Sequence, residues 1–184
     1  MSRNPHPTRT RESQALRERL ALERLARLRE GLFSELEAIR RDPEYREDDE
    51  PHRSCLRELN QMRISPLEAL AIARAFRNIP ALRARLPGVL RRLGRELGGL
   101  EDNTERQNFD CPLLERGLCL VHRAAKPIGC LAWNPGKSFT KKGWNAFAER
   151  DVLNDGLYGP QWKLRVIPLW LERVLRAARR RRPR

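Results

Sequence analysis

The chain has 184 residues, enough for one domain of ordinary size with a modest hydrophobic core. Lys and Arg outnumber Asp and Glu by 38 to 24, so the formal net charge is +14 and the pI is about 11.0. This charge balance favours contacts with polyanions. No apolar run is long enough to cross a bilayer, which argues against a membrane-spanning chain. The polar first ten residues do not have the pattern of a secretion signal. We therefore expect a cytoplasmic protein.

The N-terminal part predicts one long helix after a disordered lead-in over residues 1–12. Apolar residues recur at helical spacing over residues 13–42, and Arg and Glu fill the other faces at distances that allow i, i+4 pairs. Asp42-Pro43 ends the pattern, because a proline disfavours helical geometry in the residue before it. We expect this amphipathic helix to cover the core, with docking on a partner as the alternative.

A cysteine-cluster domain is expected over residues 50–176, and its first half reads as two helices. Ser65-Pro66-Leu67-Glu68 is a helix start that has the residues of a capping box. A second helix begins near Pro80, has a kink or break at Pro87, and ends at Gly98-Gly99.

The remaining elements of the domain lie near the C-terminus. Lys141 to Leu153 predicts a short helix that ends at Asn154-Asp155-Gly156. Trp162 to Ile167 has strand-like alternation, and Pro168 opens a final helix. The chain closes in a basic tail over residues 177–184. The expected fold class is therefore a mainly α single domain with little β-structure and a loop-rich four-cysteine site.

Three of the four cysteines lie in one segment rich in turns. Cys111, Cys119 and Cys130 share this segment, while Cys55 lies far upstream. In the cytoplasm thiols stay reduced, so four cysteines ligate metal more often than they form disulfides. Four thiolates suit zinc or an iron–sulfur cluster. The sequence predicts a metal site at these four residues, and the alternative is that some of them are small buried hydrophobic residues.

Two histidines and three cations accompany the predicted site. His52 lies three residues before the first cysteine and His122 lies between the last two, so either could add a ligand or be purely structural. Arg116, Arg123 and Lys126 could offset the negative charge of a four-thiolate centre.

The order of these cysteines resembles the zinc- or iron-chelating cysteine-cluster family (YkgJ-like). Cys111-Pro112-Leu113-Leu114 is similar to the family's Cys-Pro-Phe-Leu, and Cys119 to Cys130 is similar to its Cys-x-x-Tyr-x-x-Arg-Pro-x-x-Cys-Arg. The family's N-terminal knot, Cys-x-x-Cys-x-x-Cys-Cys, is reduced here to Cys55. The resemblance covers roughly residues 50–135 and implies metal binding without a settled activity.

The ligand spacing bears on the kind of metal centre. Structural zinc sites usually contain a pair of cysteines about two to four residues apart. The shortest gap here, between Cys111 and Cys119, is seven residues. A larger cluster accepts ligands from widely separated loops. We therefore favour an iron–sulfur cluster (4Fe-4S), with Zn as the alternative.

Two functions fit this pattern. The first is a metal- or iron–sulfur-cluster-binding protein whose basic surface contacts a protein or nucleic-acid partner. The alternative is an RNA- or ribosome-associated basic module in which a zinc site is purely structural. No glycine-rich cofactor loop, Ser/His/Asp set or pair of carboxylates indicates an enzyme or a small-molecule substrate, although relatives of the family include methylases. The candidate nucleic-acid contacts are Arg179, Arg180, Arg181 and Arg182, with Trp133, Trp144 and Trp162 available to stack on bases.

Overall fold

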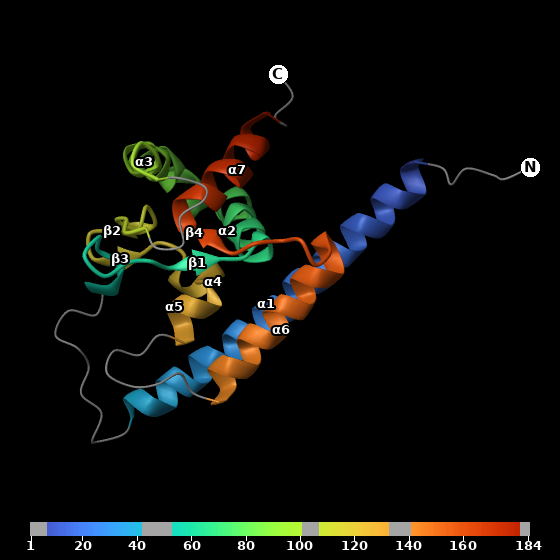
Figure 1. Ribbon diagram of the computed structural model, residues 1–184, viewed down its shortest axis with the longest axis horizontal. Coiled ribbons are helices and arrows are strands. Elements are labelled where there is room, and N and C mark those ends of the chain that lie inside the picture. Colours follow the sequence, from blue (N-terminus) through green and yellow to red (C-terminus); the bar gives the residue numbers. More distant parts are fainter. Residues whose placement is uncertain (1–6, 42–52, 101–106, 133–140, 181–184) are drawn as a thin grey trace, which may run out of the picture.

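The computed structural model describes residues 7–41, 53–100, 107–132 and 141–180, which are mainly helical with two small antiparallel sheets (Figure 1). The expected mainly α fold class is confirmed. Among the described helices, none has both the length and the apolar composition that crossing a bilayer requires. In chain order the elements are α1 (Pro7–Arg40), the 3-10 helix η1 (Arg53–Cys55), β1 (Arg63–Ile64), α2 (Pro66–Asn78), α3 (Pro80–Leu97), β2 (Leu114–Glu115), β3 (Leu118–Cys119), α4 (His122–Ala125), α5 (Ile128–Ala132), α6 (Lys141–Tyr158), β4 (Arg165–Val166) and α7 (Ile167–Arg180).

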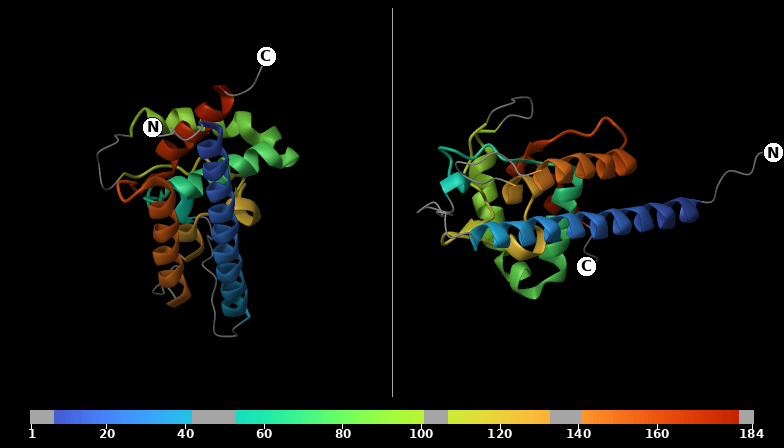
Figure 2. Two further views of the ribbon diagram at one scale, coloured as in Figure 1. Left: turned by 90° about the vertical axis from the view of Figure 1, so that its right-hand side faces the viewer. Right: turned by 90° about the horizontal axis from the view of Figure 1, so that it is seen from below.

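Helix α1 forms one side of the molecule. It begins at Pro7, inside the segment expected as a disordered lead-in, because Pro suits the first turn of a helix. It packs on α5, α6 and α2, and it lies side by side with α6 in two views (Figures 1 and 2). Leu25 and Leu32 are buried there, whereas Leu16 and Leu20 stay exposed on the N-terminal part, which extends past the other helices. The C-terminal half of α1 therefore shares one core with the other described helices.

Helix α2 lies at the centre of the packing, in contact with α1, α3, α4, α6 and α7. Its start confirms the predicted capping box. The Ser65 hydroxyl accepts a hydrogen bond from the Glu68 backbone N–H at 3.3 Å, and the Glu68 carboxylate accepts one from the Ser65 N–H at 2.8 Å. Two of the N–H groups that a helix start leaves without partners are thereby satisfied.

Glu68 connects α2 to two other helices. Its side chain is buried, with 2% of its surface exposed. Oε1 accepts a hydrogen bond from the Ile128 N–H at 2.8 Å, at the first residue of α5. Oε2 lies 3.7 Å from Nη1 of Arg150, a buried cation on α6. Because the carboxylate also faces the positive end of α2, one negative charge stabilises three helices at their meeting point.

Helix α6 is longer than the sequence predicts. The expected end at Asn154-Asp155-Gly156 is wrong, since α6 continues to Tyr158. Asn154 is fully buried in the helix, and its amide oxygen accepts a hydrogen bond from the Leu67 N–H at 3.1 Å. Its amide nitrogen donates to the Arg150 carbonyl at 2.7 Å. The long-range bond to Leu67 and the bond to Arg150 within α6 together outweigh the local turn preference of Asn-Asp-Gly.

Two further elements differ from the predicted pattern. Helix α3 continues through Pro87 without a break, because Leu82, Val89 and Leu93 bury one face of it. The strand expected over Trp162–Ile167 shrinks to β4, which pairs with β1 in the register Arg63↔Val166. Ile167 is instead the first residue of α7, in agreement with the predicted final helix.

The Glu68 network can be tested by removing its charge. Replacing Glu68 with Gln puts an amide N–H₂ where an acceptor is needed and leaves Arg150 without one of its anions. We expect the free energy of unfolding to fall by about 2–4 kcal/mol. Urea unfolding followed by circular dichroism measures this change.

Glu30→Gln is the matched control, because Glu30 is exposed on α1 and the substitution should cost less than about 0.5 kcal/mol. If the two variants lose the same stability, Glu68 does not have the structural role assigned to it.

Candidate metal centre

The four cysteines come from four separate segments of the fold. Cys55 ends η1, Cys111 precedes the turn into β2, Cys119 lies in β3, and Cys130 lies in α5. All four are free thiols. The charge of a Cys55 thiolate acts on each of the other three, so the distant cysteine lies among the clustered ones.

The position of Cys55 follows from pairing between two backbone segments, residues 55–61 and 108–111. The Cys111 N–H donates to the Cys55 carbonyl at 2.9 Å, and the Phe109 N–H donates to the Asn60 carbonyl at 3.2 Å. Asn60 is buried, and its amide donates to the same Cys55 carbonyl at 3.3 Å. Phe109 is fully buried between these segments and the core. Cys55 is therefore fixed beside Cys111 by backbone geometry.

Cys119 is placed by a hairpin that sequence patterns did not reveal. Strands β2 and β3 pair Leu114 with Cys119 across a two-residue turn. The turn residues Arg116 and Gly117 have φ angles of 52° and 73°, as a hairpin turn with two left-handed residues requires. Gly117 is the only local signal, since each strand is two residues long.

Backbone donors face two of the sulfurs. The Cys111 sulfur accepts a hydrogen bond from the N–H of Leu113, and the Cys119 sulfur accepts one from the N–H of Val121. Each donor lies two residues after its cysteine. Such bonds stabilise negative charge on sulfur, which both a bound metal and a thiolate require.

The thiols differ in acidity. The Cys111 thiol donates a hydrogen bond to the Cys55 sulfur, which lowers the pKa of Cys55 to about 7. The same bond, together with burial, raises the pKa of Cys111 well above its usual value. Burial raises the pKa of Cys119 and Cys130, and the charge of Lys126 opposes the rise in both. Metal binding here would therefore release protons.

Among the three cations suggested by the sequence, Lys126 acts on the thiols. Its charge lowers the pKa of Cys55 as well, after the larger effects of the Cys111 bond and burial. Arg123 instead lies over the Phe33 ring at 5.1 Å and pairs with Glu37 at 3.3 Å. Arg116 is exposed in the hairpin turn.

The structure describes only one of the two histidines, His122. Nδ1 of His122 lies 3.3 Å from Nζ of Lys126, and its ring meets Phe33 edge-on at 5.4 Å between centroids. These contacts describe a packed residue that helps to hold Lys126 in place. His52 lies outside the described residues.

The donor set fits a thiophilic metal or cluster, but the ligand geometry is not formed. In the described ranges, no group of three or more His, Cys, Asp or Glu side chains is arranged to hold a metal ion. The structure brings Cys55 and Cys111 into contact and places Cys119 and Cys130 within electrostatic reach. Their role as metal ligands therefore stays a prediction.

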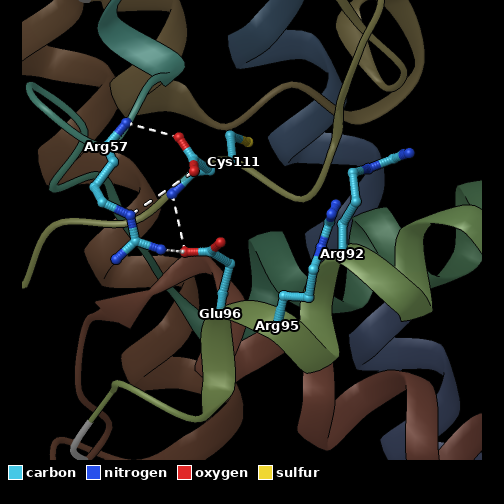
Figure 3. Close-up of a pocket in the computed structure, with 6 residues that line it drawn as sticks. Arg57, Arg92, Arg95, Glu96 and Cys111 are labelled. Atoms are coloured by element: carbon cyan, nitrogen blue, oxygen red, sulfur yellow. Dashed lines mark hydrogen bonds and ion pairs between the residues drawn. The ribbon is translucent and has the colours of Figure 1, made fainter.

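A pocket opens beside Cys111 that the sequence did not indicate. Its volume is about 330 Å³, and Cys111 shares its wall with charged residues of α3 and of the two paired segments (Figure 3). The spacing of arginines on α3 indicates one wall of the pocket, but nothing in the sequence places the other walls against it. The lining residues are Arg57, Arg92, Arg95, Glu96, Asp110 and Cys111.

The structure describes only some of the candidate nucleic-acid contacts. The side chains of Arg179 and Arg180, and all of Arg181, Arg182 and Trp133, lie outside the described residues. Trp144, on α6, is 60% exposed. Trp162 donates its indole N–H to Asp155 at 2.6 Å.

Comparisons with known proteins give no match: no family model, no curated protein and no solved structure is similar to this chain. Function therefore has to be inferred from the residues themselves.

Proposed function

We propose that the chain binds one metal ion or iron–sulfur cluster through Cys55, Cys111, Cys119 and Cys130. The observation that carries this proposal is the placement of Cys55. A backbone hydrogen bond and a thiol hydrogen bond hold it against Cys111, although more than fifty residues separate the two. The resemblance to the zinc- or iron-chelating cysteine-cluster family supports the same four ligands.

The electrostatics of the thiols favour a bound cation over a purely space-filling role. Four thiolates here would repel one another, and the charge of Lys126 would offset only part of that repulsion. A metal cation removes this repulsion and takes the place of the thiol protons. Core packing alone does not account for Cys55, which is only partly buried and yet bonds to the Cys111 thiol.

The chain's own residues hold and shield the centre. The N–H groups of Leu113 and Val121 stabilise two sulfurs, and Lys126 supplies the nearest positive charge. An iron–sulfur cluster would supply one-electron redox chemistry, whereas zinc would supply a structural cross-link. The absence of a close cysteine pair in the sequence favours the cluster.

Reconstitution of the full chain tests this proposal. Under anaerobic conditions with iron and sulfide, we expect about four iron atoms per chain and a broad visible absorption band from sulfur-to-iron charge transfer. Cys55→Ser should reduce the bound iron at least severalfold, because it removes the ligand that only the fold brings to the site. Zinc loading of the same apoprotein measures the alternative.

Leu118→Ser is the control variant, since Leu118 precedes Cys119 in β3 but its side chain is 67% exposed and is not proposed as a ligand. It should retain the metal content of the wild type. A Cys55→Ser variant that binds as much iron and zinc as the wild type rules out the four-cysteine centre.

A second candidate function is contact with a single-stranded nucleic acid through the basic surface. The specific observation in its favour is the 60% exposed indole of Trp144 on α6, a helix on which Lys142 is exposed as well. An exposed aromatic ring among cations can stack on bases of any sequence. The net charge of +14 favours the same partner.

Salt dependence of RNA binding tests this second function. The logarithm of the affinity for a single-stranded RNA should fall linearly with the logarithm of salt concentration, by about 0.7 per neutralised phosphate. Deleting residues 179–184 should flatten that slope, while Trp144→Ala should lower affinity by about 1–3 kcal/mol at unchanged slope. Deletion of residues 1–6, which hold one arginine, is the control. An unchanged slope after the tail deletion contradicts a role for the tail.

A further inference from the structure

The pocket beside Cys111 lies between helix α3 and the two paired backbone segments. Arg92, Arg95 and Glu96 come from the last turns of α3, while Arg57 and Asp110 come from the segments that hold Cys55 and Cys111 (Figure 3). Its volume of about 330 Å³ is at the small end of the range for ligand sites. The size therefore suits a small molecule.

One side of the pocket is internally paired. The Arg57 guanidinium lies 2.7 Å from Oε2 of Glu96 and 3.8 Å from a carboxylate oxygen of Asp110. Two backbone N–H groups complete this side, from Asp110 to Glu96 at 3.0 Å and from Arg57 to Asp110 at 2.9 Å. Glu96 is buried, so its carboxylate is held in place, whereas the Arg57 and Asp110 side chains that pair on this side are more than half exposed.

The other side of the pocket carries donors that the described residues do not use. Arg92 donates Nε to the Pro112 carbonyl at 2.9 Å and Nη1 to Glu115 at 3.3 Å. Its Nη2 is buried and has no hydrogen-bond partner among the described residues. Arg95 makes no ion pair or hydrogen bond through its side chain within the described ranges. Both side chains extend from α3 toward the loop that carries Cys111 (Figure 3).

The Arg95 guanidinium lines the pocket without an acceptor among the described residues, and a bound oxyanion would supply one. Guanidinium groups match phosphate and carboxylate oxygens in geometry as well as charge. A cation would meet Arg92 and Arg95, and an apolar molecule would meet charged walls. We propose that this pocket binds the phosphate or carboxylate group of a small molecule through Arg95 and Arg92, beside Cys111.

The proposal does not depend on metal occupancy, so its failure and the failure of the cysteine centre are separate results. Isothermal titration of the full chain with inorganic phosphate, and in a second arm with acetate, measures the site at low ionic strength. We expect saturable binding with a stoichiometry of about one. The arm with the higher affinity tells whether the pocket prefers phosphate or carboxylate.

Arg95→Gln is the main variant, because Arg95 has no partner among the described residues whose loss would unfold the chain. It should weaken binding at least about tenfold. Arg95→Lys keeps the positive charge but lacks the planar set of guanidinium donors. Its affinity for the anion should therefore lie between those of the wild type and Arg95→Gln. Arg83→Gln removes the same charge from an exposed residue of α3 that does not line the pocket, and it should stay within about twofold of the wild type.

Circular dichroism and a thermal melt establish that each variant is folded before titration. Equal weakening by Arg95→Gln and Arg83→Gln would mean that the anion responds only to net charge, and this overturns the proposal. Failure of the wild type to saturate with either probe overturns it as well.

Discussion

The fold depends on a buried carboxylate at the start of the central helix. Glu68 accepts backbone hydrogen bonds from Ser65 and Ile128, and it pairs with the buried Arg150. A buried charge is tolerated only when it is paired and fully hydrogen-bonded, and these three partners meet that condition. Because they come from the α2 start, α5 and α6, any loosening of this group separates elements that are distant in the sequence.

The same group connects the helical core to the cysteines. Helix α5 starts at Ile128, whose N–H is held by Glu68, and Cys130 follows within the same short helix. Gly129 allows close packing here, because a Cβ at this position would lie 2.6 Å from the sulfur of Met62. The backbone carbonyl of Met62 in turn accepts a hydrogen bond from the Ile167 N–H at the start of α7. The position of Cys130 is therefore set by the packing of α5 on the core.

Local signals were sufficient for several structural features that depend on neighbours in sequence. The Ser65–Glu68 capping box, the helix start at Pro80 and the helix end before Gly98 were all predictable. The end of α6 was not, because Asn154 accepts a hydrogen bond from Leu67, in a helix nearly ninety residues earlier. The β1–β4 pairing was missed for the same reason.

The candidate site was likewise predictable only in part. Cysteine content alone pointed to the four thiols, and the charge of Lys126 was anticipated together with those of Arg116 and Arg123. Only the fold separates these three cations, since Arg123 is held by Phe33 and Glu37. The pocket could not be predicted, because its walls come from segments that meet through long-range backbone hydrogen bonds.

The central claim, that four sulfurs from these separate segments share one metal centre, is tested most directly by X-ray absorption at the metal edge. Full-length protein purified anaerobically is the sample, and the iron and zinc edges are both recorded. The account predicts a first shell of sulfur alone at about 2.3 Å, and an iron–sulfur cluster would add iron neighbours beyond it. A first shell of nitrogen or oxygen at about 2.0–2.2 Å would contradict it.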